Sequence, residues 1–209
     1  MPISKAFTGI KLPTEITGAY NVYMPFIETA LPGVLIFEPA VFGDSRGYFF
    51  EAYNEKTFHN GGVRLKFVQD NQSSSSYGVI RGLHYQRNPS GQNKLVRVLH
   101  GRILDVAVDI RKGSPHYGKV VAVELSDENK KQLLIPVGFA HGFSVLSEKA
   151  VVLYKCDSLY NRESEGGICY NDRDLNIDWQ IPPGRENVSD KDKLLPSLRD
   201  CEANFIFEK

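Results

Sequence analysis

The feature that most constrains the fold is a succession of short stretches in which apolar and polar residues alternate, separated by glycine-rich turns, over residues 33–156. In Arg102–Ile110, the apolar side chains at even positions from Leu104 fall on one face of a strand, and Asp105 and Asp109 fall on the other. The predicted strands are Val34–Glu38, Tyr48–Tyr53, Leu65–Gln69, Val79–Gln86, Leu95–His100, Arg102–Ile110, Lys119–Leu125, Gln132–Ile135, Phe143–Leu146 and Val151–Cys156. Many short strands at this spacing are typical of a sandwich, barrel or jelly roll. We therefore expect an all-β protein.

Outside the predicted strands, the sequence indicates few other elements of secondary structure. A helix is predicted at residues 54–60, a second near the C-terminus, and a four-serine turn at Ser73–Ser76. The chain has 209 residues, enough for one large domain or one domain and an appendage. Residues 1–23 show no clear periodicity, and Met24 offers a second plausible start. We expect an N-terminal extension of unknown role over residues 1–23 and a single domain over residues 24–209.

Charge and cysteine usage narrow the function classes. The 25 Lys and Arg residues balance 25 Asp and Glu residues, so the basic excess that favours nucleic-acid binding is missing. No apolar run is long enough to cross a membrane, and the first ten residues lack the order of a signal peptide. Three cysteines without a CxxC pair are typical of reduced thiols. We expect a cytoplasmic protein that binds neither nucleic acid nor membranes.

A cluster of polar residues on or beside the predicted strands points to a pocket. Its members, within 26 residues, are Gln69, Asn71, Arg81, His84 and Lys94. Taken singly, each fits an exposed edge strand; together they favour a strand face that looks into a wet cavity. Strict alternation would place Arg81 and His84 on opposite faces. A bulge at Gly82 would realign them.

A second motif, P-x-G-x-x-H, is formed by Pro136, Gly138 and His141 and resembles the second motif of cupins. Metal-binding cupins carry H-x-H in their first motif, whereas this chain has His84, a tyrosine and Gln86 there. Two histidines without a clear carboxylate are too few to hold a first-row metal against water. We expect no metal.

Larger blocks of sequence resemble the dTDP-4-dehydrorhamnose 3,5-epimerase family of cupin-type epimerases. The matching blocks are VFGDSRGYFFE (41–51), FVQDNQS (67–73), GVIRGLHYQ (78–86), NKLVRV (93–98), DVAVDIRKGSPHYG (105–118), ENKKQLLIPVGFAHGF (128–143), LYK (153–155), NDRDLNIDW (171–179) and SDKD (189–192). The resemblance implies a cupin-type jelly roll with a few short helices, a homodimer, and neither a metal nor an organic cofactor. The implied reaction inverts C3 and C5 of dTDP-4-dehydro-6-deoxy-D-glucose, giving dTDP-4-dehydro-L-rhamnose for dTDP-L-rhamnose biosynthesis.

The resemblance also assigns four catalytic roles. His84 matches the base, a task that suits imidazole because its ordinary pKa lies near neutral pH. Asp192 matches the carboxylate that orients this ring, a pairing that only the resemblance supplies. Lys94 matches the cation facing the C4 oxygen, where positive charge favours the enolate. Tyr154 matches the general acid on the other face, since a phenol keeps its proton at neutral pH.

Further positions resemble those that contact substrate in the family. They are Arg46, Glu51, Gln69, Asn71, Arg81, His141, Tyr160, Glu165 and Lys191. Arginine can engage two oxygens of a diphosphate at once, which the acidic members cannot do, so Glu51 and Glu165 suit sugar hydroxyls or arginine orientation. Tyr160 matches an aromatic position that stacks on thymine, and Leu159 departs from relatives with an aromatic residue there.

Three alternatives stay open. A relative that inverts only C3 or only C5 of a related nucleotide 4-ketosugar could keep the same acid–base set, although Tyr154 favours double inversion. A metal-dependent cupin oxygenase lacks support because the H-x-H motif is incomplete. A catalytically silent sugar-binding cupin would not need His84, Lys94 and Asp192 together.

Overall fold

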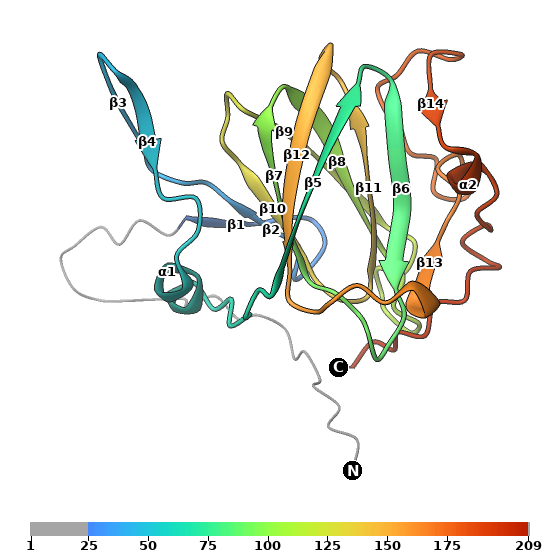
Figure 1. Ribbon diagram of the computed structural model, residues 1–209. Helices are drawn as coiled ribbons and strands as arrows, with labels where there is room; N and C mark the ends of the chain where they lie inside the picture. The colour runs from blue at the N-terminus through green and yellow to red at the C-terminus, as the bar shows by residue number, and fades with distance from the viewer. Residues whose placement is uncertain (1–24, 209) are drawn as a thin grey trace.

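The computed structural model describes residues 25–208, which form two facing antiparallel sheets and a separate hairpin (Figure 1). The first sheet has the order β1 (Phe26–Glu28), β2 (Leu35–Phe37), β10 (Gln132–Ile135), β7 (Lys94–His100), β12 (Lys149–Cys156) and β5 (Gln69–Ser76). The second has the order β13 (Glu165–Gly167), β6 (Val79–Gln86), β11 (Phe139–Val145), β8 (Arg102–Asp109) and β9 (Val120–Ser126), and β14 (Asn187–Val188) pairs in parallel with β6. The extension predicted at residues 1–23 lies outside the described residues.

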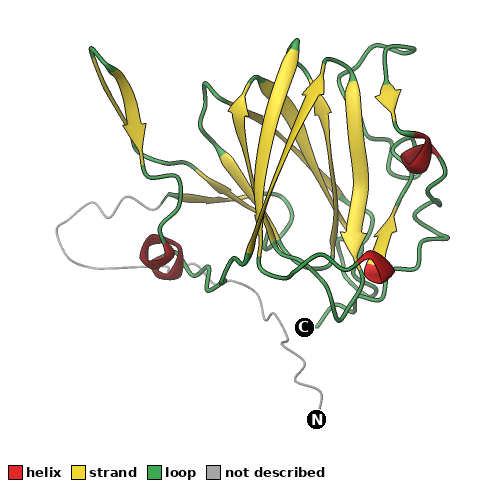
Figure 2. Cartoon of the chain, viewed as in Figure 1, coloured by secondary structure: helices red, strands yellow, loops and turns green. Residues whose placement is uncertain are grey.

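Helices are short and few among the described residues (Figure 2). They are α1 (Glu55–Asn60), the 3-10 turn η1 (Arg162–Ser164) and α2 (Asp190–Lys193). Within residues 25–208, no helix is long and apolar enough to cross a membrane. The prediction of an all-β sandwich with a few short helices is confirmed.

Alternation along the strands builds the core between the two sheets. From the first sheet, Val96 and Val152 are buried there; from the second, Ala107 and Phe143 face them. Because successive side chains point to opposite faces of a strand, the odd positions of β8 look inward, toward the first sheet. Asp105 is therefore an inward-facing residue of the second sheet. It lies on the face opposite Val106 and Val108, as the alternation predicts, but the sequence did not say that this face looks inward.

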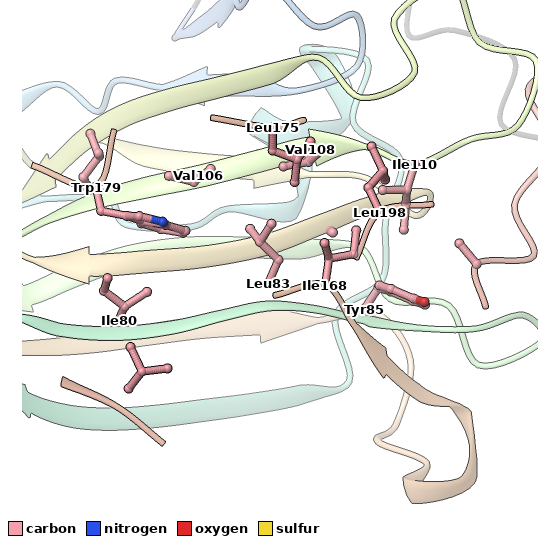
Figure 3. Packing of buried hydrophobic residues seen from close by; sticks show 14 of the residues in the cluster. Ile80, Leu83, Tyr85, Val106, Val108, Ile110, Ile168, Leu175, Trp179 and Leu198 are labelled. Carbon is pink, nitrogen blue, oxygen red and sulfur yellow. The ribbon is translucent and has the colours of Figure 1, made fainter. Parts of the chain in front are cut away.

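The outer face of the second sheet is covered by the chain after β13 (Figure 3). Val106 and Val108 on β8 and Leu83 on β6 pack against Leu175 and Trp179 of this segment. The indole Nε1–H of Trp179 donates to a backbone carbonyl, so the ring's polar edge is satisfied within the packed layer. This layer carries the chain back to α2, which brings the last predicted catalytic residue to the sheets.

The hairpin β3 (Val41–Asp44) and β4 (Gly47–Phe50) projects away from the sandwich (Figure 1). It leads into α1, which matches the helix predicted at residues 54–60. Asn54 caps this helix by accepting from the backbone N–H groups of Lys56 and Thr57. Phe58 from α1 packs with aromatic residues of β1 and β2, which anchors the helix. The base of the hairpin contacts the body through Arg97 over the Phe50 ring and Lys130 over the Tyr48 ring.

Two local predictions are wrong. Residues Leu65–Val68 are irregular, and the strand begins only at Gln69. Ser73–Ser76 is not a turn but the second half of β5, which pairs with β12 from Gln69 opposite Cys156 to Ser76 opposite Lys149. Serine favours turns, but here the backbone hydrogen bonds that β12 offers override that local preference.

Candidate active site

A bulge in β6 turns two predicted site residues toward the same side of the sheet. The register of β6 against β11 changes between the pair His84–His141 and the pair Arg81–Phe143, so β6 holds one residue more than β11. The extra residue falls beside Gly82, as the sequence predicted. Both Arg81 and His84 line the same cavity as a result.

Only glycine fits at this bulge. Gly82 has φ of +120°, which side chains with a Cβ rarely adopt, and a Cβ there would lie 2.6 Å from the Cα of Gly142. The same backbone position donates its N–H to Asp192 Oδ2 at 3.2 Å. The close approach of β6 to β11 and the placement of Asp192 therefore both depend on this glycine.

One cavity of about 470 Å³ collects all four predicted catalytic residues, His84, Lys94, Tyr154 and Asp192. Three of the predicted substrate-contacting residues also line it: Arg81, His141 and Lys191. Sequence analysis missed the remaining lining residues, which are Gln72, Ser73, Val79, Ile80, Gly142, Phe143, Asn187 and Ser189. Most of these are small or apolar residues, which do not by themselves indicate catalysis or binding. Only the packing of the two sheets brings them to the cavity.

His84 and Asp192 form a hydrogen-bonded pair at the cavity wall. His84 Nε2 lies 2.8 Å from Asp192 Oδ1; the His84 side chain is 33% exposed and that of Asp192 only 7%. Burial acts to raise the pKa of Asp192, but hydrogen bonds from His84, from the Gly82 backbone and from Ser189 outweigh it and lower the pKa. An ionised Asp192 holds a proton on Nε2 of His84, which leaves Nδ1 as the base nitrogen.

Replacing Asp192 by asparagine should weaken this base while leaving the pocket intact. An amide whose oxygen keeps the bond from the Gly82 N–H turns its NH2 toward Nε2, which favours the wrong tautomer, and it has no charge to stabilise the imidazolium, so we expect proton abstraction to fall by up to about 10⁴-fold. Deuterium exchange into the substrate measures the effect. Asp190→Asn is the matched control, because Asp190 lies on the same helix, 98% exposed and paired with Lys193. Equal exchange in the two variants would remove Asp192 from the mechanism.

Lys94 and Tyr154 approach the cavity from the first sheet, opposite His84 on the second. The Lys94 Nζ lies 5.9 Å from the centre of the Tyr154 ring. Burial lowers the pKa of Lys94, and the negative charges of Asp105 and Glu165 oppose that shift. Burial also raises the pKa of Tyr154, which therefore keeps its proton at neutral pH. The cavity thus has an imidazole on one wall and a lysine side chain and a phenol on the other.

A chain of hydrogen bonds runs beside the cavity through five of the predicted substrate contacts. Lys191 Nζ donates to Glu165 Oε2 at 2.7 Å, and the Tyr160 hydroxyl reaches the same oxygen at 3.3 Å. The hydrogen bond from Lys191 is the main reason that the pKa of Glu165 is lowered. Gln69 accepts from the Tyr160 backbone N–H and donates to Asn71 Oδ1. Of these five residues, only Lys191 lines the cavity itself.

The remaining two predicted contacts, Arg46 and Glu51, lie on and just after the projecting hairpin. Arg46 pairs with Asp44, and its side chain is 88% exposed. Glu51 accepts hydrogen bonds from the side chains of Asn54 and Thr57 at the start of α1. Neither residue lines the cavity of its own chain.

The donor set of the cavity does not fit a metal site. Among residues 25–208, no group of three or more His, Cys, Asp and Glu side chains is placed to hold an ion. The two cavity histidines, His84 and His141, each have Nε2 bonded to a carboxylate.

The fold and the site define a β-sandwich protein with an acid–base pocket between its sheets. The family model for dTDP-4-dehydrorhamnose 3,5-epimerase matches residues 28–200. A dTDP-4-dehydrorhamnose 3,5-epimerase of Shigella flexneri is 54% identical over 170 residues, 81% of this chain and 93% of that protein. The chain belongs to the dTDP-4-dehydrorhamnose 3,5-epimerase family.

Solved structures agree with this assignment. The dTDP-6-deoxy-D-glucose-3,5-epimerase of Legionella pneumophila, in complex with dTDP-4-keto-L-rhamnose, superposes with a TM-score of 0.80 at 48% identity, covering 83% of this chain and 92% of that one. A 3'-monoepimerase of Streptomyces bikiniensis in complex with dTDP-quinovose has a TM-score of 0.76 at 30% identity, covering 82% and 86%. The predicted family and the cupin-like sandwich are confirmed.

Proposed function

We propose that this protein is a 3,5-epimerase that converts dTDP-4-dehydro-6-deoxy-D-glucose to dTDP-4-dehydro-L-rhamnose, without a metal or an organic cofactor, in dTDP-L-rhamnose biosynthesis. One observation carries the proposal: the His84–Asp192 pair and the Tyr154 phenol line one cavity from facing sheets. A sugar ring between them meets a base on one face and an acid on the other. Inversion next to a ketone needs this arrangement.

The chemistry follows from the protonation states. Nδ1 of neutral His84 removes the proton from a carbon next to the C4 ketone, and the electron pair moves onto the C4 oxygen. The Lys94 ammonium stabilises the resulting enolate. Tyr154 then delivers a proton to the opposite face of the same carbon, which inverts it. The His84 imidazolium then loses its proton to solvent and the Tyr154 phenolate takes one up from solvent, which resets both groups. Each inversion therefore replaces a substrate hydrogen with one from water.

Proton NMR of the protein with dTDP-4-dehydro-6-deoxy-D-glucose in D2O tests the proposal. Deuterium at both C3 and C5, with rhamnose formed after a reductase and NADPH are added, is the expected result. Deuterium at one carbon alone would indicate a single-site epimerase, the activity named for the Streptomyces relative. No exchange with nucleotide still bound would contradict epimerase activity on this sugar, and metal analysis of the same sample would then test the oxygenase alternative.

Tyr154→Phe should separate abstraction from inversion. Loss of the phenol proton removes the acid but leaves the His84 base, so exchange with solvent should persist while inverted product falls, most strongly at C5. The buried phenol holds its proton at neutral pH, so this difference should hold across pH 6–8. NMR in D2O quantifies both quantities in one sample. If exchange and inversion fall by the same factor, Tyr154 is not the reprotonating acid.

A homodimer would complete the site. Val41, Phe42, Tyr48 and Phe49 on the projecting hairpin are 44%, 65%, 61% and 71% exposed, an apolar surface that favours a partner chain. Arg46, in the turn of the same hairpin, does not line the cavity of its own chain. We infer that the hairpin of a second copy brings Arg46 and Glu51 to the cavity.

Mixed dimers test this exchange of hairpins. Arg46→Ala and His84→Asn each inactivate every site of their own homodimer. A mixed dimer of the two variants holds one site with both natural residues if the hairpin serves the partner, so about half of the wild-type rate should return. Two affinity tags allow the mixed species to be purified. No recovery in the mixed dimer would place Arg46 at its own chain's site or outside both.

The compartment is also part of the proposal. Cys156, Cys169 and Cys201 are all free thiols, and Cys156 is fully buried. Free thiols in every described cysteine position are typical of a reducing compartment. We place the protein in the cytoplasm, with a nucleotide sugar as its partner rather than nucleic acid or a membrane.

A further inference from the structure

A second histidine–carboxylate pair lies in the cavity wall beside the first. His141 is directly opposite His84 in the register of β11 and β6, and its Nε2 lies 2.7 Å from Oδ1 of Asp105 on β8. This pair is more deeply buried than the His84–Asp192 pair: the side chains of His141 and Asp105 are 8% and 0% exposed. The sequence signal was present as an aspartate inside an otherwise apolar strand, yet Asp105 matched no predicted role.

Only one of the two carboxylate oxygens of Asp105 is hydrogen-bonded to His141. Its second oxygen, Oδ2, is buried and has no hydrogen-bond partner within residues 25–208. A fully buried carboxylate is costly unless its charge is compensated, so a group with this geometry requires an explanation. A positive charge near the cavity wall would compensate it.

The side chain of Lys94, which can carry a positive charge, also has no close polar partner among residues 25–208. Within the described part of the chain, its ammonium forms no hydrogen bond and no ion pair within 4 Å, although it lines the same cavity. Burial lowers the pKa of Lys94, and among the charges that oppose this shift is Asp105, across the sandwich on the second sheet. The other titratable groups that face Lys94 are Cys156 and Tyr154 on β12 and Glu165 on β13. Of these, the thiol of Cys156 is neutral at pH 7, because burial raises its pKa to about 11.

We propose that Asp105 is a positioning residue of the cavity, whose buried carboxylate holds the His141 imidazole by Nε2 and supplies the fixed negative charge that balances the Lys94 ammonium. The effect of Asp105 on catalysis rests on the proposed function, in which Lys94 stabilises an enolate. Asp105 touches neither the substrate nor the base. It acts on the reaction through the two cavity residues whose charge and orientation it sets.

The consequence for pH dependence has a definite sign. Lys94 stabilises an enolate only when protonated, so its contribution is lost as pH rises through its pKa. Removing the negative charge of Asp105 lowers that pKa further and moves the alkaline limb of activity toward neutral pH. The substitution leaves the other charged residues that line the cavity, Arg81, Lys191 and Asp192, in place.

Lysine NMR of the free protein tests the proposal without any substrate. The Lys94 signal, labelled at Cε and identified by its loss in Lys94→Gln, is followed against pH in the wild type and in Asp105→Asn. We expect the titration of Lys94 to move down by about one pH unit. Asp109→Asn is the matched control: Asp109 is equally buried on the same strand but pairs with Arg111 and Ser114. An unchanged Lys94 titration in Asp105→Asn, or an equal shift in both variants, would overturn the proposal.

The wild-type protein gives a second test that does not depend on the variant folding. Long-range proton–nitrogen NMR of the His141 ring should show hydrogen on Nε2 at neutral pH. A neutral ring protonated only at Nδ1 would contradict the bond to Asp105. The two NMR experiments test the role of Asp105, whereas the epimerase assay tests the proposed function. A shifted Lys94 titration in a protein without epimerase activity would support the role of Asp105 and contradict the proposed function.

Discussion

Replacing His84 by asparagine is expected to lower deuterium exchange at C3 and C5 by about 10²–10⁴-fold, because the variant has no nitrogen that can accept a proton. The amide keeps much of the volume of the ring and can still bond Asp192, so the pocket should persist. Binding of dTDP, measured by calorimetry, should stay within a few-fold of the wild type, since the residues predicted to contact the nucleotide, such as Tyr160, are other than His84. Loss of exchange with binding retained is the signature of a missing base.

His59→Asn is the control for this substitution. His59 is exposed at the end of α1, remote from the cavity lining, and the chemical change is identical. It should leave exchange unchanged. Wild-type exchange in the His84 variant would remove His84 from the mechanism, and the base would then have to be sought among the other cavity residues.

Lys94→Gln is expected to reduce both exchange and inversion by about 10²–10³-fold, the typical effect of removing one preorganised donor to a developing oxyanion. Unlike Tyr154→Phe, this change affects formation of the enolate itself, so exchange and inversion should fall together. Burial lowers the pKa of Lys94, so the wild-type enzyme should lose activity on the alkaline side below the ordinary lysine value of about 10.4. Rates of exchange between pH 6 and 10 measure this limb.

The matched control is Lys155→Gln on the same strand pair. Lys155 pairs with Asp70 and does not line the cavity, so its loss removes the same charge without touching the site. Lys94→Arg keeps the charge and should retain more activity than Lys94→Gln. If the Gln and Arg variants lose activity equally, shape rather than charge is the contribution of Lys94.

Local sequence signals predicted local structure well. The strand predicted at Val79–Gln86 is β6 with the same bounds, and the bulge at Gly82 is present. Asn54 begins α1 as a cap because its side chain can satisfy free backbone N–H groups one turn ahead. The turn predicted at Ser73–Ser76 was wrong because a strand is stabilised by its partner strand. The sequence of β5 does not indicate that β12 pairs with it.

The alternating pattern by itself determined that this chain is built from short strands and left a sandwich, a barrel or a jelly roll open, because a period of two says which face of a strand is apolar but not how the strands pair. The blocks of sequence identified the family and, through the resemblance, predicted the acid–base set. The resemblance implied that His84 and Asp192, 108 positions apart, form a pair, and the tertiary structure brings them into contact. Only the tertiary structure showed that Asp105 hydrogen-bonds to His141. It also placed Arg46 on a projecting hairpin outside its own cavity. Such long-range contacts depend on how the two sheets pack and on the path of the chain between them, and neither can be predicted from local periodicity.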